Sequence, residues 1–232
     1  MNHKSGCLIC GEELVYSEDL NNLECQVCKK SFESNVACKN KHYICDECHG
    51  DGAMDLIVKY CLNSKEIDPI KLAVELMKFP QIKMHGPEHH LLVPAVMLTV
   101  YQNTTEKIEN LEKILTLAKK RAEKVPGGYC GSHGNCGAGV GSGIFMSLIT
   151  RATPISDKEW QLSNMITGSC LMKIAEKGGP RCCKRDSFIA IANTCDFVND
   201  KLQIEIPYSK DVVCEFSHLN KECLFDDCDY FK

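Results

Sequence analysis

Cysteines spaced as metal ligands dominate the first 48 residues. Seven of the chain's seventeen cysteines lie there, together with a histidine that fits the same pattern. Two cysteines separated by two residues form a turn that brings both sulfurs to one ion, and a second pair completes the tetrahedron that zinc prefers. Two zinc ions are therefore expected, held by Cys7, Cys10, Cys25, Cys28, Cys38, His42, Cys45 and Cys48.

The spacing leaves the pairing of these ligands open. A sequential arrangement gives the first four ligands to one ion and the last four to the other, whereas a cross-brace of the RING type alternates the pairs. His49 is an alternative to His42, and two such cysteine pairs would also suit a rubredoxin-type iron site. Because residues 1–50 contain few apolar side chains, we expect a zinc-ribbon-like or treble-clef-like module that metal binding folds.

Further reactive side chains gather at three expected helix starts in residues 51–232. Helix N-termini present free N–H groups and partial positive charge, which stabilise thiolates and bound anions. If the three ends meet, they form one site of imidazoles and thiols, with Arg181 and Lys184 binding an anionic substrate or cofactor. The catalytic residues expected there are His85, Glu88, His89, His90, Cys130 and Cys136.

The C-terminal residues carry three cysteines in a sequence rich in loops. Three such thiols suit an iron–sulfur cluster, of the four-iron–four-sulfur type for instance, whose fourth ligand would come from Cys182, Cys183 or Cys195. A third zinc site is an alternative, and buried thiols can also act simply as small hydrophobes. The residues considered for this site are Cys182, Cys183, Cys214, Cys223 and Cys228.

Helical patterns fill the region that must position these groups. Asp68-Pro69 reads as an N-cap followed by proline at the first helical position, and Pro94 should kink the apolar helix that contains it. The glycine-rich segment 137–143 is expected to be a loop, and it does not match a nucleotide-binding loop because no strand precedes it. Helices are expected over 51–63, 68–79, 86–100, 104–124, 144–150, 156–176 and 179–198, with strands only at 202–206 and 211–213.

The predicted fold is therefore mainly α. A small zinc-binding module over 1–50 precedes an all-α cysteine-rich domain over 51–232, which ends in an irregular tail. No apolar run approaches the roughly 20 residues that span a bilayer. The first residues (MNHKSGC) lack the apolar run of a signal peptide. The expected location is the cytoplasm, where thiols stay reduced, so that seventeen cysteines indicate metal ligation or redox chemistry.

Charge counts against nucleic-acid binding. The formal net charge is −4, and residues 1–50 hold five lysines against eight acidic side chains. Binding to phosphates normally rests on clustered lysine and arginine. We therefore expect no nucleic-acid partner, and the lack of a long apolar run leads us to expect no membrane partner.

Four motifs make the whole chain similar to a known family. They read HGPEHHxLVPAVML, VPGGYCGxxGxCGAxxGxGIF, GGPRCCKRDS and CxFSxxNxECxxxxC. Together they resemble an uncharacterised cysteine-rich family of anaerobic bacteria and archaea. The resemblance implies a zinc-ribbon-like N-terminus ahead of a helical domain. Some members of that family are fused to a class I methyltransferase, which implies a partner enzyme of that kind, and no established activity accompanies the family.

A second, more distant resemblance concerns redox chemistry. CGAGVGSGIFMSLI followed by GGPRCC is similar to a redox-active family named for its C-GC-A-x-x-G-C-C pattern. That family has an Asn–Cys–Ala segment where this chain has His89-His90, so the match is incomplete. Our hypothesis is a metal-binding redox protein that uses an iron–sulfur cluster or reactive thiolates, and the residues leave open whether it is an enzyme such as an oxidoreductase. The alternative is a non-enzymatic zinc-binding adaptor or metallochaperone that recruits a partner protein.

Overall fold

A β-hairpin and a short helix form the N-terminal module. The computed structural model describes residue 7 and residues 9–232. Strands β1 (Leu14–Glu24) and β2 (Ser31–Cys38) pair antiparallel, with an irregular register between Tyr16 and Asn21. Helix α1 (Asp46–Gly50) follows. The sequence patterns did not predict this hairpin, because its alternation of apolar and polar residues is weak and most of its side chains are exposed.

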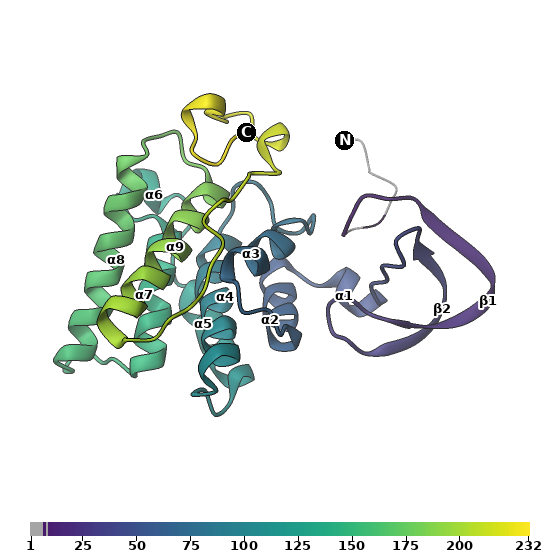
Figure 1. The fold of residues 1–232 in the computed structure, drawn as a ribbon, viewed down its shortest axis with the longest axis horizontal. Helices are drawn as coiled ribbons and strands as arrows, with labels where there is room; N and C mark the ends of the chain where they lie inside the picture. Colours follow the sequence, from purple (N-terminus) through teal and green to yellow (C-terminus); the bar gives the residue numbers. More distant parts are fainter. Residues whose placement is uncertain (1–6, 8) are drawn as a thin grey trace.

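The rest of the chain is mainly helical, which confirms the predicted fold class. Helix α4 lies at the centre, with thirteen of its eighteen residues buried, and it packs against α2, α3, α5, α7 and α9. Figure 1 shows these helices bundled beside the N-terminal module. Their bounds are α2 Ala53–Asn63, α3 Pro69–Met77, α4 Glu88–Thr105, α5 Leu111–Ala122, α6 Tyr129–Ser132, α7 Gly137–Thr150, α8 Lys158–Glu176 and α9 Cys183–Leu202.

Helix α7 begins seven residues earlier than expected. The glycine-rich segment predicted to be a loop forms its first two turns. A Cβ atom on Gly141 would lie 2.9 Å from Cδ of Pro94 and 3.2 Å from the carbonyl oxygen of His90. Glycine therefore lets α7 approach α4 at the turn where proline removes a helical hydrogen bond. Helix α4 continues through Pro94 to Thr105, so packing against α7 outweighs the low helix propensity of glycine.

The C-terminal segment returns along the bundle without forming strands. After α9 the chain runs back to the end at which α9 begins (Figure 1) and makes two short 3₁₀ turns, η1 (Ser217–Leu219) and η2 (Phe225–Asp227). The strands predicted at 202–206 and 211–213 are therefore wrong. Ile206 is buried against the helices instead. The Asp68 carboxylate, which caps α3, also accepts hydrogen bonds from the backbone and hydroxyl of Ser209, and so ties this segment to the bundle.

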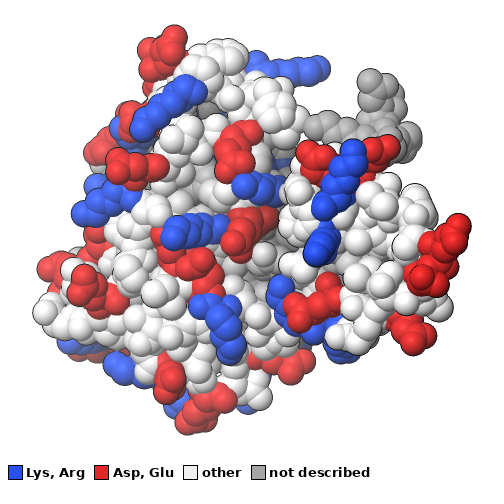
Figure 2. All heavy atoms as spheres, turned by 45° about the vertical axis from the view of Figure 1, so that its right-hand side comes forward, with Lys and Arg blue, Asp and Glu red and all other residues white. Residues whose placement is uncertain are grey.

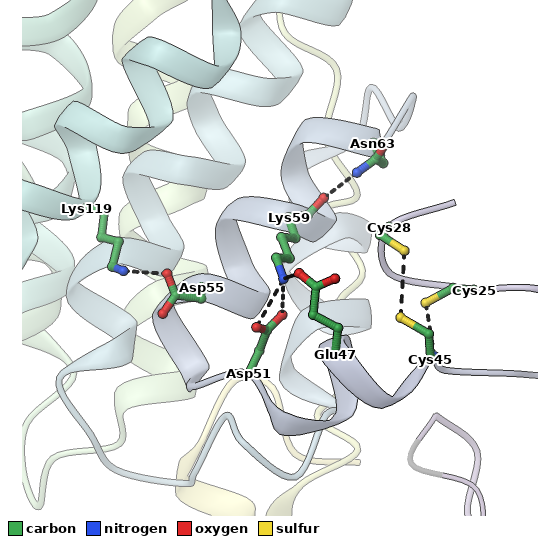
Figure 3. A network of polar contacts seen from close by, with 9 residues as sticks. All are labelled: Cys25, Cys28, Cys45, Glu47, Asp51, Asp55, Lys59, Asn63 and Lys119. Carbon is green, nitrogen blue, oxygen red and sulfur yellow. Dashed lines mark hydrogen bonds and ion pairs between the residues drawn. The ribbon is translucent and has the colours of Figure 1, made fainter. Parts of the chain in front are cut away.

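The N-terminal module and the helices share one hydrophobic core. Val27 and the cysteines at positions 25, 45 and 48 belong to the same buried cluster as Leu56 of α2. Polar contacts also connect the N-terminal module to α2 (Figure 3). The Lys59 ammonium lies 2.7 Å from a carboxylate oxygen of Glu47 and 3.1 Å from one of Asp51.

The surface carries both charge signs. On the face drawn in Figure 2, lysine and arginine side chains are interspersed with aspartate and glutamate. Within the described part of the chain, every helix is too short or too polar to cross a membrane.

Candidate metal centres and a neighbouring cavity

Two groups of four side chains in the N-terminal module could each hold a metal ion. In each group all four candidate donor atoms lie within 4.8 Å of one another. In the first, Nδ1 of His42 lies 3.3 Å from the sulfur of Cys10, and the sulfurs of Cys10 and Cys38 are 3.8 Å apart. The groups are Cys7, Cys10, Cys38 and His42, and Cys25, Cys28, Cys45 and Cys48.

The ligand pairs alternate along the chain, as in a cross-brace. The hairpin explains why the pairs alternate and do not follow the sequential arrangement. Cys10 precedes β1 and Cys38 ends β2, where it pairs with Leu14, so the first group sits at the open end of the hairpin. Cys25 and Cys28 lie in the turn at the other end. The eleven residues of β1, at about 3.3 Å each, hold the first and second cysteine pairs far apart.

The backbone of the module is arranged to stabilise thiolates. The N–H of Ile9 donates to the sulfur of Cys7 at 3.4 Å, and the N–H of His42 donates to that of Cys38 at 3.3 Å. Burial raises the pKa of Cys7 to about 11. Although burial acts in the same upward direction at Cys10, hydrogen bonds from Glu12 N–H, His42 and Asn40 lower its pKa to about 6. A bound cation would keep all the sulfurs of a group ionised, so the donor set fits a thiophilic ion such as zinc.

Four further cysteines line a small cavity at the start of α9, which we call the tail cavity. Its volume is about 20 Å³, and its remaining wall is mostly apolar, including Phe188 and Tyr230. Of the three candidates for a fourth thiol, the structure brings only Cys182 to the three tail cysteines. Cys183 faces a different cavity, and Cys195 is buried in the helical core. The cysteines of the tail cavity are Cys182, Cys214, Cys223 and Cys228.

The tail cysteines repeat the local geometry of the N-terminal ligands. The N–H two residues downstream donates to sulfur at 3.4 Å in two cases, from Phe216 to Cys214 and from Phe225 to Cys223. Ile9 and Cys7 show the same relation. Burial raises the pKa of Cys182 to about 11, while the N–H of Arg185 in the first turn of α9 acts to lower it. Such N–H···S bonds favour the thiolate form that a metal binds.

A larger cavity of about 310 Å³ lies where α4, α7 and α9 begin, and we call it the His/Cys cavity. Residues predicted to be reactive at all three helix starts line it. The ring of His90 lies against Gly137, where a Cβ atom would come within 1.8 Å of the imidazole, so a larger residue at the start of α7 would displace this ring. The lining includes His85, His89, His90, Cys130, Cys136, Arg181, Cys183 and Asp186.

Each histidine of this cavity has one nitrogen that faces an oxygen acceptor. Nδ1 of His90 lies 3.0 Å from the carbonyl of Val125, and Nδ1 of His89 lies 3.3 Å from that of Gly86. Nε2 of His85 lies 3.1 Å from the amide oxygen of Asn220. Because a carbonyl can only accept, these nitrogens carry the protons. Burial lowers the pKa of His89 to about 3, so its imidazole is neutral.

Two of the predicted site residues do not line the His/Cys cavity. The Glu88 carboxylate accepts a hydrogen bond from the N–H of Lys83 at 2.9 Å. The Lys184 ammonium donates to the carbonyls of Met77 and Ile82 and lies 4.2 Å from the centre of the Phe216 ring. Burial lowers the pKa of Lys184 to about 8. Both side chains form hydrogen bonds with the segment that precedes α4, and neither lines the His/Cys cavity.

An ion pair that sequence reasoning missed connects the two cavities. Nε of Arg185 lies 3.1 Å from a carboxylate oxygen of Asp186, and both side chains are buried. Arg185 lines the tail cavity and Asp186 the His/Cys cavity. Helical spacing could have indicated these neighbours, because side chains three residues apart lie on the same face of a helix. Cys182 and Arg185 have this spacing, and so do Cys183 and Asp186.

Comparison with known proteins places most of this chain in a family. A family of unknown function (DUF5714) matches residues 57–231. The chain belongs to this family. The DUF5714 match includes both cavities described above and leaves the two N-terminal metal-ligand groups outside. No match to the chain is found among curated proteins or among solved structures.

Proposed function

We propose that this DUF5714 protein is a redox protein in which the four cysteines that line the tail cavity ligate an iron–sulfur cluster, and in which the N-terminal module holds two structural zinc ions. The observation that carries the proposal is the meeting of four cysteines, from the start of α9 and from the irregular tail, around one mostly apolar cavity. Four thiolates are the usual donor set for an iron–sulfur cluster.

The tail thiols do not form a donor group compact enough for a single ion. Among the described residues, groups of three or more donor atoms within 4.8 Å of one another occur only in the N-terminal module. A cluster several atoms wide needs thiolates set further apart than one ion does. When bound, such a cluster supplies one-electron redox chemistry.

The protein groups around the tail thiols suit that chemistry. Apolar side chains restrict water, and the N–H groups of Phe216 and Phe225 donate to two of the sulfurs. The guanidinium of Arg185, paired with the Asp186 carboxylate, and the Glu222 side chain place charged groups at the wall of the cavity. Hydrogen bonds to sulfur, burial and nearby charges determine the reduction potential of a cluster.

The N-terminal groups have the character of structural sites. Each supplies four protein ligands to one position, which leaves no coordination site open for a substrate. Zinc, which has no redox chemistry of its own, is the ion we assign to both.

Metal analysis after anaerobic purification tests the proposal. We expect two zinc ions per chain, together with iron and acid-labile sulfide. Cys223→Ser should lose tail-site iron while keeping both zinc ions, because it removes one ligand of the tail cavity. Cys195→Ala is the matched control, since this thiol is buried outside both cavities, and it should keep the full metal content.

Reduction tests the redox role separately. Dithionite should bleach the visible absorption of the reconstituted protein, and ferricyanide should restore it. A colourless protein that contains only zinc after anaerobic reconstitution would overturn the cluster. It would instead favour a zinc-binding adaptor that recruits a partner protein.

A further inference from the structure

The cysteines outside the N-terminal module fall into three sets. One set is buried in the helical core, where thiols act as small apolar side chains. Four thiols line the tail cavity. A third set lines the His/Cys cavity and is not used by the proposed tail cluster. The core set is Cys61, Cys170 and Cys195, and the His/Cys set is Cys130, Cys136 and Cys183.

The thiols of the His/Cys cavity come from three separate elements. Cys130 lies on α6, Cys136 is the N-cap of α7, and Cys183 is the first residue of α9. The positions are close enough for the charge of Cys183 to interact with those of both other thiols. Packing alone does not require three thiols to face one cavity.

The buried imidazole of His89 provides an independent indication of a ligand. Its Nδ1 faces the Gly86 carbonyl, which leaves the lone pair on Nε2. Within the described part of the chain this Nε2 is buried without a hydrogen-bond partner, and the side chain is 2% exposed. A buried lone pair without a partner carries a desolvation cost. A backbone carbonyl on one ring nitrogen, with the other nitrogen free, is the arrangement found in metal-binding histidines.

We propose that the His/Cys cavity holds a second iron–sulfur cluster, ligated by the thiolates of Cys130, Cys136 and Cys183 and by Nε2 of His89. The inference rests on the iron–sulfur chemistry proposed for this chain. A cluster fits better than a single ion, because no three of these donor atoms lie within 4.8 Å of one another and the cavity has a volume of about 310 Å³. Histidine replaces cysteine as a ligand in some known clusters.

The two centres would share the first turn of α9. Cys182 and Cys183 are consecutive residues that line different cavities. His85 also connects the cavities, because it lines one and faces Asn220 at the wall of the other. Clusters so close together suit one-electron exchange, in which one is oxidised as the other is reduced and no bond is made or broken.

Iron analysis of single variants separates the two centres. If both clusters are of the four-iron type, the anaerobically reconstituted full-length protein should hold about eight irons per chain. Cys183→Ser and Cys223→Ser should each lose about half of this iron, while Cys195→Ala keeps all of it. Circular dichroism checks folding, and Cys130→Ser on α6, a helix with no buried residue, serves as a second variant if Cys183→Ser fails to fold.

The histidine ligand has a spectroscopic signature. After reduction by dithionite, pulsed electron paramagnetic resonance should detect hyperfine coupling to a nitrogen nucleus. His89→Ala should remove this coupling. His133→Ala, an exposed histidine outside the lining, should leave it unchanged.

Different failures have different meanings. One result would overturn the second cluster and still support the tail cluster. In it, Cys223→Ser loses all iron, while Cys183→Ser and Cys130→Ser both keep all of it. A nitrogen coupling unchanged in His89→Ala would overturn the assigned fourth ligand. Absence of iron from the reconstituted wild-type protein would overturn both clusters together.

Discussion

Cys182 and Cys183 illustrate how neighbouring residues take different environments. Cys182 has extended backbone angles as the N-cap of α9, whereas Cys183 is the first helical residue. This change of backbone direction sends the two thiols to different cavities. The sequence predicted reactive residues at this position from the adjacent cysteines and the expected helix start. Their separation into two cavities could not be predicted, because it depends on where the tail and α6 lie.

At the same scale, His42→Ala should lower the zinc content from two ions per chain to one. His42 belongs to the first group only, and the second group has four cysteines of its own. Metal analysis under native conditions measures the change. His49→Ala is the control for the alternative ligand considered from the sequence, and it should keep two ions. Loss of zinc in His49→Ala with retention in His42→Ala would contradict the assignment.

At the scale of elements, small residues on α7 determine how the bundle packs. Local propensity predicted that the glycines at 137–143 form a loop, and this prediction was wrong because it ignored the neighbouring helices. A Cβ on Gly143 would lie 2.0 Å from the Thr167 hydroxyl of α8, and one on Gly141 would contact Pro94 of α4. The expected cap of α3, by contrast, depends on adjacent residues only, and the structure confirms that Asp68 caps this helix.

Alanine at two helical glycines should therefore have opposite effects. Gly141→Ala should lower the free energy of unfolding by about 1–3 kcal/mol, because the proline ring and a backbone carbonyl leave no room for a methyl group. Gly168→Ala should raise it by up to about 1 kcal/mol, since a Cβ there meets nothing within 4 Å and alanine favours the helix. Urea denaturation of both variants measures the difference. Equal destabilisation of the two variants would contradict the explanation that close packing against α4 requires glycine at position 141.

For the whole molecule, the question is how far metal binding supports the fold. The N-terminal module contributes few apolar side chains of its own, and several of these are candidate metal ligands. The helices bury a larger core around α4. We therefore expect the module to depend on metal and the bundle to depend on apolar packing, despite the core that they share at α2.

Removing zinc with a chelator should unfold the module selectively. Hydrogen exchange of backbone amides in β1 and β2 should approach the rate of an unfolded chain, because the ligand groups at both ends of the hairpin lose their ions. Amides in the middle of α4 should keep their protection. A parallel loss of protection in α4 would mean that module and bundle unfold as one unit.

The sequence by itself determined the eight N-terminal ligand candidates, the mainly helical class and the candidate site residues at three helix starts. These features follow from spacing and periodicity, which act over a few neighbouring residues. Only the tertiary structure decided that ligand pairs alternate, because β1 separates the first pair from the second. It also decided that Cys182 joins the tail thiols while Cys183 joins the histidines. Such choices depend on contacts between residues far apart in the chain, which no local pattern specifies.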